Sequence, residues 1–145
     1  MPVMKQRQAL TVRCGLLCLM VACLNASASE ISTWSQVAEE IAARITLAES
    51  LYQNDKQNEA GQAVTQAYFG VFEDRKMEAA MRMELGAKHT YQVEKQFGAL
   101  RKAIRQQADR QTVQTLAQGI REAVVRDARV LDQANIPMQV FEIKP

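Results

Sequence analysis

Proline, cysteine and histidine are scarce in this chain, and each scarcity excludes a class of structure or chemistry. No proline occurs between Pro2 and Pro137, so no residue in that long span forces a helix to end. The residues after Cys23 contain no cysteine and can form neither disulfides nor thiolate metal sites. His89 is the only histidine, so a hydrolase that needs a histidine base would have to use that residue.

Motifs of the common enzyme and cofactor classes are also missing. The sequence contains no glycine-rich phosphate loop, no HExxH, no G-x-S-x-G and no C-x-x-C-H for covalent haem. The Glu-x-x-His pair of di-iron bundles is absent, because Gly86 stands three residues before His89. We therefore expect a protein that is not an enzyme.

The first 28 residues have the three parts of a secretory signal peptide. Cys14–Leu24 is an apolar stretch too short to span a bilayer as a helix, and residues 26–28 are the small residues of a cleavage site. The basic residues before them are Lys5, Arg7 and Arg13. We expect a periplasmic or otherwise extracytoplasmic protein whose mature form begins near Ser29.

The same segment allows a second interpretation, in which the mature chain carries a lipid. Residues 19–23 resemble a lipoprotein cleavage box, with Ala22 before Cys23 and with Met20 at a position where leucine is usual. A lipid on Cys23 would leave residues 24–30 as a short tether to a membrane.

Loss of the signal peptide changes the sign of the net charge. The full chain has 18 Lys and Arg against 16 Asp and Glu, which gives a net charge of +2. Without the three basic residues of the signal peptide, 15 basic residues remain against 16 acidic ones, and the net charge is −1. Such a chain has no basic surplus for phosphate contacts, so we expect no nucleic-acid partner.

Four segments carry apolar residues at three- and four-residue spacing, which predicts four amphipathic helices over residues 33–53, 57–73, 76–107 and 109–134. Thr33 and Gln36 predict a capping box for the first helix, and Asp109 is a good N-cap for the fourth. We expect residues 29–135 to form an all-α, up-down four-helix bundle. A tail of residues 136–145 follows, extended over residues 138–145.

Each segment has an expected core stripe, and Gly86 and Gly98 are expected kink positions in the third. In the first two segments the stripes are Trp34, Val37, Ala38, Ile41, Ile45, Ala48 and Tyr52, then Ala60, Ala63, Val64, Ala67, Tyr68, Val71 and Phe72. In the last two they are Met81, Leu85, His89, Val93, Phe97, Leu100 and Ile104, then Val113, Leu116, Ala117, Ile120, Val124 and Leu131.

Two acidic residues at the junction of the second and third segments are candidate metal ligands. The turn between Glu73 and Glu78 would gather both carboxylates beside the aromatic rings of Phe69 and Phe72, and hard cations bind carboxylate oxygens. The simpler interpretation is a helix-end carboxylate at Glu73 and an ion pair from Glu78 to Arg82 one turn later.

His89 is the third candidate ligand, in the middle of an apolar stripe. The simpler interpretation is a core or boundary histidine satisfied by a hydrogen bond. As a metal ligand it would need carboxylates from other helices, for which Glu49 and Asp127 are candidates. On one continuous helix His89 would lie roughly 16 Å from Glu78, so the two could not share an ion.

Two further carboxylates, Glu84 and Glu94, lie beside Tyr91 on the flank of the third segment. We expect both to be solvated or boundary charges.

Several short motifs together resemble the exported N-terminal domain of bacterial iron permeases of the iron–lead permease family. They are Ala67-Tyr68-Phe69, Phe72-Glu73, Met77-Glu78, Glu94, Phe97 and Leu100-Arg101. The likeness covers about residues 34–107. It implies a role in iron uptake, in which the domain receives or passes iron outside the cytoplasmic membrane. It also implies Glu73 and Glu78 as acidic ligands, and a membrane iron permease or a periplasmic iron-handling protein as partner.

The sequence departs from that family in one respect. The family's permease core has membrane helices with Arg-Glu-x-x-Glu motifs, whereas Arg121-Glu122 is followed here by Ala123-Val124-Val125. We therefore expect an accessory in iron or other divalent-metal uptake, either a free-standing relative of the exported domain or a truncated permease. The alternative is a structural or interaction bundle without metal, such as a periplasmic adaptor or a lipid-anchored partner-binding protein.

Overall fold

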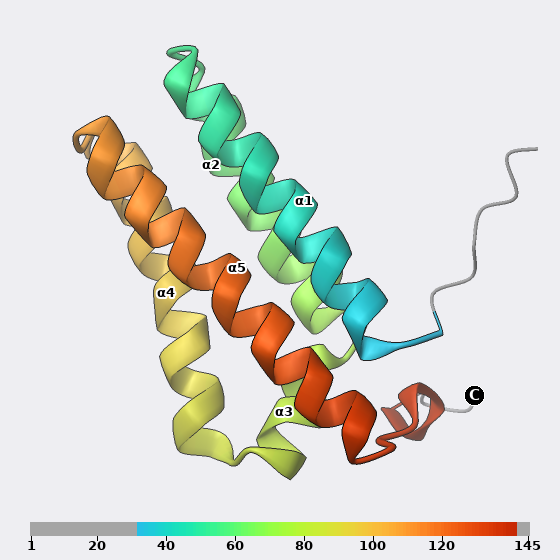
Figure 1. Cartoon of the computed structure of the whole chain (residues 1–145). Coiled ribbons are helices and arrows are strands. Elements are labelled where there is room, and N and C mark those ends of the chain that lie inside the picture. Colours follow the sequence, from blue (N-terminus) through green and yellow to red (C-terminus); the bar gives the residue numbers. More distant parts are fainter. Residues whose placement is uncertain (1–31, 142–145) are drawn as a thin grey trace, which may run out of the picture.

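The structure of this chain is a computed structural model that describes residues 32–141 (Figure 1). The predicted signal peptide, its cleavage site and Cys23 lie outside the described residues, as do residues 142–145 of the tail. Residues 32–141 contain helices and turns but no strand, which confirms the all-α prediction. The elements are α1 (Trp34–Gln53), α2 (Gln57–Ala67), η1 (Tyr68–Glu73), α3 (Met77–Glu84), α4 (Ala87–Arg105), α5 (Arg110–Gln133) and η2 (Met138–Phe141).

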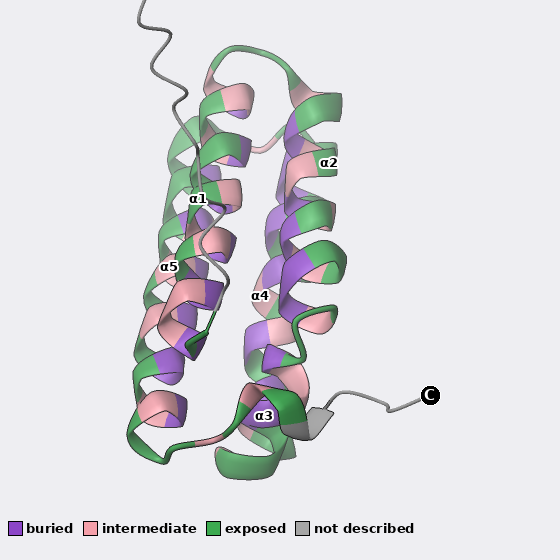
Figure 2. Cartoon of the chain, turned by 90° about the vertical axis from the view of Figure 1, so that its right-hand side faces the viewer, coloured by how far each residue is buried: buried purple, intermediate pink, exposed green. Residues whose placement is uncertain are grey.

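Four long helices lie side by side around one apolar core. α1 contacts α2 and α5, and α4 contacts the same two helices. Figure 1 shows the short α3 crossing one end of these four, and Figure 2 shows the buried residues on the sides that face one another. Within the described residues, no helix is long and apolar enough to cross a membrane.

The first and fourth predicted helices are confirmed. The Gln36 backbone N–H donates to the Thr33 hydroxyl, and the Gln36 side chain accepts from the Thr33 backbone N–H, which is the predicted capping box. All seven expected core residues of α1 are buried. Asp109 caps α5 by accepting from the Thr112 backbone N–H at 2.8 Å. The α5 stripe is buried as expected, except that Leu116 is half-buried.

The second predicted helix changes form near its end. Regular α2 gives way to η1, a π-helical turn, and such insertions occur frequently at functional sites. The widened turn shifts the side-chain register, so Phe69 is half exposed while its neighbours Val71 and Phe72 are both fully buried. The expected core residues of this segment that are only half-buried are Ala63 and Tyr68.

The single helix predicted for residues 76–107 is wrong. Gly86 separates α3 from α4 with a φ of +88°, a conformation that glycine adopts without the strain of a Cβ. Gly98, the other expected kink, lies inside regular α4. The break interrupts the apolar stripe, so Leu85 and His89 are half-buried rather than buried. The spacing of roughly 16 Å between Glu78 and His89 assumed one continuous helix and does not apply.

The start of α1 is held by the end of α5. The Asp132 carboxylate accepts from the backbone N–H groups of Trp34 (2.8 Å) and Ser35 (3.0 Å), which have no partner within their own helix. The Trp34 indole N–H donates to the Ile136 carbonyl at 2.6 Å. The predicted extended tail is wrong over Met138–Phe141, where the chain forms the 3-10 turn η2.

Candidate functional site

Five side chains from three elements form what we call the acidic cluster. Tyr68 and Glu73 lie at the two ends of η1, Glu78 and Arg82 lie one turn apart on α3, and Glu94 lies on α4. The turn at Gly86 brings α3 back against α4, and α3 also contacts η1. The cluster therefore depends on both irregular points of the fold, the π-helical turn and the glycine break.

Arg82 is the cation of the acidic cluster. It donates from Nη2 to Oε1 of Glu78 and, at 3.1 Å, to Oε1 of Glu94. The Glu78 and Glu94 side chains are 23% and 20% exposed, whereas that of Arg82 is 52% exposed. Arg82 thus bridges Glu78 on α3 and Glu94 on α4 with a side chain that is half exposed to solvent.

The cluster has more negative than positive charge, and the pKa values of three of its members, Tyr68, Arg82 and Glu94, are raised. Partial burial and the negative charge of Glu78 raise the pKa of Glu94, while Arg82 opposes this effect. Burial, followed by the charge and the hydrogen bond of Glu73, raises the pKa of Tyr68 to about 12. Glu94 and Glu78 add to the shift at Tyr68.

Of the two predicted carboxylate ligands, Glu78 makes an ion pair in the cluster, and Glu94 joins it there although the sequence did not indicate Glu94 as a ligand. Glu73 belongs to the cluster through its effect on the pKa of Tyr68, to which Glu78 contributes least. Glu94 is a boundary residue, as expected, but it also lies beside Glu78 across the α3–α4 turn. Glu84 is exposed at the end of α3. Within residues 32–141, no group of three or more His, Cys, Asp or Glu side chains is arranged to hold a metal ion.

His89 lies in a different pair. Its Nε2 is 2.8 Å from Oδ2 of Asp127, and Oδ1 of Asp127 accepts from Arg126 Nε at 2.9 Å. The Asp127 side chain is 3% exposed and that of His89 is 38% exposed, so His89 is a boundary histidine with a hydrogen-bond partner. The pair joins α4 to α5, whereas the acidic cluster joins η1, α3 and α4.

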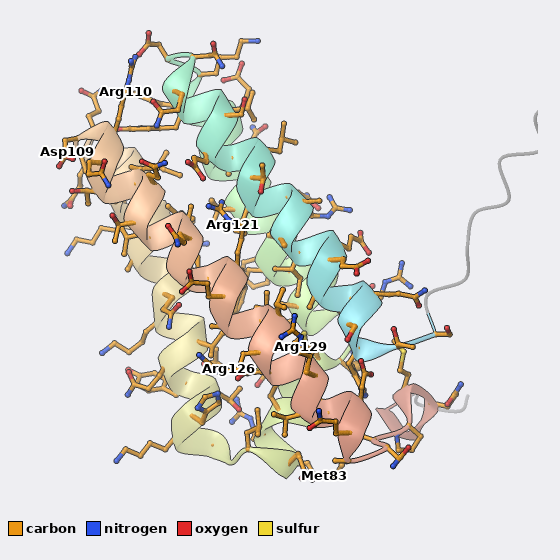
Figure 3. All side chains as sticks on the ribbon, in the orientation of Figure 1. Met83, Asp109, Arg110, Arg121, Arg126 and Arg129 are labelled. Atoms are coloured by element: carbon orange, nitrogen blue, oxygen red, sulfur yellow. The ribbon has the colours of Figure 1, made fainter. Side chains whose placement is uncertain are left out.

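Glu49, the other residue considered as a partner for His89, is engaged elsewhere. Its Oε2 accepts from Arg121 Nη1 at 2.8 Å, and both side chains are largely buried. Arg110, Arg121, Arg126 and Arg129 all lie along α5 (Figure 3). The Arg121 pair joins α5 to α1, and Glu49 therefore serves the contact between these helices.

A pocket of about 180 Å³ lies against the acidic cluster, between α2, η1 and α4. Three aromatic side chains line it, namely Tyr68, Phe69 and Phe97. Tyr68 stands at 87° to Phe69 with ring centroids 4.8 Å apart, and at 61° to Phe97 with centroids 5.4 Å apart. Glu94 and Arg101 supply the charged groups of the lining.

Comparisons with protein-family models, with curated proteins and with solved structures found no match for the chain.

Proposed function

We propose that this chain is an accessory protein in the uptake of iron or another divalent metal outside the cytoplasm, with the acidic cluster as a weak cation site. The observation that carries the proposal is that one cation, Arg82, bridges Glu78 and Glu94, while these two glutamates and Glu73 all raise the pKa of Tyr68. The resemblance of residues 34–107 to the exported domain of iron permeases adds support.

The donor set of the cluster suits a hard cation. Carboxylate and phenol oxygens are ligands of the kind that iron, manganese and magnesium accept. A bound cation would take over the role of Arg82, whose half-exposed side chain can leave Glu78 and Glu94 for solvent. Competition with Arg82 keeps the affinity low, which suits a protein that passes a metal on to a partner.

The proposal includes an arrangement of the whole chain and a partner. A cleaved signal peptide precedes an up-down four-helix bundle made by α1, α2 with η1, α4 and α5, into which α3 is inserted at one end. The proposed partner is a membrane iron permease or a periplasmic iron-handling protein. Contact with the membrane is made through that partner, or through a lipid on Cys23.

Thermal unfolding with added metal tests the proposal on the chain that begins at Ser29. At ferrous iron or manganese concentrations about ten times Kd, we expect a rise in Tm of roughly 5 °C. Glu73→Gln and Glu78→Gln should reduce this rise, whereas Glu39→Gln, on the exposed face of α1, should keep it. No response in the parent, or equal responses in all three variants, would exclude the acidic cluster as a metal site.

The alternative function is a structural or partner-binding bundle without metal. The double contact of Arg82 with Glu78 and Glu94 favours it, because a cluster that already holds its own cation needs no other. The same titration separates the two functions, since only the metal site predicts a rise in Tm that depends on Glu73 and Glu78.

A further inference from the structure

The pocket beside the acidic cluster has a feature that metal binding does not use, because its walls are aromatic. Tyr68 stands at a large angle to both Phe69 and Phe97, so these rings pack edge to face rather than in one flat stack. Phe69 is 50% exposed. A phenylalanine half exposed beside a pocket of this kind leaves ring surface available for a ligand.

The pocket also carries one charge of each sign along α4. Glu94 and Arg101 are seven residues apart on this helix, about 10 Å along its axis, and Gly98 lies between them in the same lining. Arg101 has no ion pair with any residue of the described chain. Because Gly98 has no side chain, nothing fills the space between the two charges.

We propose that this pocket binds the quaternary ammonium group of a small zwitterion, with the ammonium between the aromatic rings and Glu94 and the anion at Arg101. A quaternary ammonium cannot donate hydrogen bonds, so aromatic faces and a nearby carboxylate are the groups that recognise it. The small volume of the pocket selects a compact head group. Choline phosphate has this chemistry, whether as a free solute or as the head group of a phospholipid.

Calorimetric titration of the chain from Ser29 with choline phosphate tests the proposal. We expect saturable binding of choline phosphate, weaker binding of choline, and no binding of 3,3-dimethylbutanol, the uncharged carbon analogue of choline. Inorganic phosphate should not compete. Equal binding of the uncharged analogue, or no binding of choline phosphate at millimolar concentrations, would overturn the ammonium site.

A variant that fills the pocket with a side chain is the most direct test of binding there. A Cβ added at Gly98 meets no atom within 4 Å, and the same is true at Gly61 on α2, so a side chain at either position begins in open space. Gly98→Leu should abolish binding of choline phosphate, whereas the matched control Gly61→Leu should retain it. Unchanged binding in Gly98→Leu would overturn the assignment of this pocket.

Separate variants of Glu94 and Arg101 test the role of each charge. Glu94→Gln should weaken choline phosphate by about tenfold. Arg101→Gln should weaken choline phosphate but leave choline unchanged, since choline has no anion. If Arg101→Gln weakens both ligands equally, Arg101 does not select the anion and the zwitterion assignment is wrong.

The source of the ligand is decided by vesicles. Co-sedimentation with phosphatidylcholine vesicles that is lost in Gly98→Leu identifies a lipid head group, whereas binding of the free compound alone identifies a soluble zwitterion. This site shares Tyr68 and Glu94 with the acidic cluster and is otherwise formed by different residues. Gly98→Leu should leave the metal response of Glu73 and Glu78 intact, so failure of one proposal leaves the other standing.

Discussion

Carboxylates are partnered differently on the two sides of the molecule. Where α5 meets α1 and α4, each inward carboxylate has its own donors: Glu49 has Arg121, Asp127 has His89 and Arg126, and Asp132 has the start of α1. In the acidic cluster, three glutamates raise the pKa of one phenol, and Arg82 serves two of the three. The carboxylates that have their own donors join helices. The glutamates of the acidic cluster share a single cation, and they are therefore the candidates for binding a ligand.

Asp132→Ala tests a carboxylate that has its own donors and should have the largest effect on stability. It removes the acceptor for two backbone N–H groups at the start of α1, which costs about 2 kcal/mol. We expect Tm, followed by circular dichroism, to fall by roughly 10 °C. Glu39→Ala is the control, because Glu39 lies on the exposed face of α1. Equal losses in the two variants would contradict the role of Asp132.

Gly86→Ala tests the turn that assembles the acidic cluster. A Cβ at a φ of +88° is strained, so we expect a loss of about 1–2 kcal/mol. Gly98→Ala, inside α4 with open space around it, should instead stabilise by up to about 1 kcal/mol. Urea denaturation of both variants measures the difference, and losses in both would show that neither glycine acts through its backbone conformation.

Arg82→Gln tests the acidic cluster. Loss of the bridging cation should barely change Tm, because the Arg82 side chain is half exposed. Arg82→Gln should strengthen metal binding several-fold if the metal ion competes with Arg82, because Glu78 and Glu94 would then lack a counterion. Arg121→Gln is the matched opposite, since it should lower Tm without changing metal binding. A stronger loss of Tm in Arg82→Gln than in Arg121→Gln would reverse the comparison.

Glu94→Gln should give the smallest effect, and one that depends on pH. The folded-state pKa of Glu94 is raised above its ordinary 4.5, so its contribution to stability is full below pH 4.5 and is lost as pH rises through the folded pKa. The glutamine has no charge to bury. We expect Glu94→Gln to have a Tm about 1–2 °C above the parent at pH 7 and no advantage at pH 4. The same advantage at both pH values would point to packing instead.

The regular helices could be predicted from the sequence, and the acidic cluster could be predicted only in part. The α1 stripe continues without a break, so its buried residues follow from a 3.6-residue period alone. The register shift in η1 has no local signal in the sequence. Gly86 was an expected kink, but the complete break between α3 and α4 at this residue was not predicted. Glu94 joins Glu78 only because the chain turns back at Gly86, and a continuous helix had separated them.

Contacts between residues far apart in the sequence could not be predicted either. Asp132 meets Trp34 and Ser35 across nearly the full length of the described chain, and no local pattern indicates this. His89 shows the opposite case. Its place on an apolar stripe already favoured a core or boundary residue with a hydrogen bond, and the structure gives it the boundary position and Asp127 as partner.

The hydrogen bonds that join Trp34 to Asp132 and Ile136 determine how the domain would be oriented by a tether at its N-terminal end. They hold the beginning of α1 at the end of α5, and η1 and α3 contact these two helices in turn. Figure 1 places the start of α1, the end of α5 and α3 at the same end of the molecule. A tether attached before residue 32 would therefore turn the acidic cluster toward the surface to which the tether is anchored. The α1–α2 and α4–α5 turns would then point away from that surface.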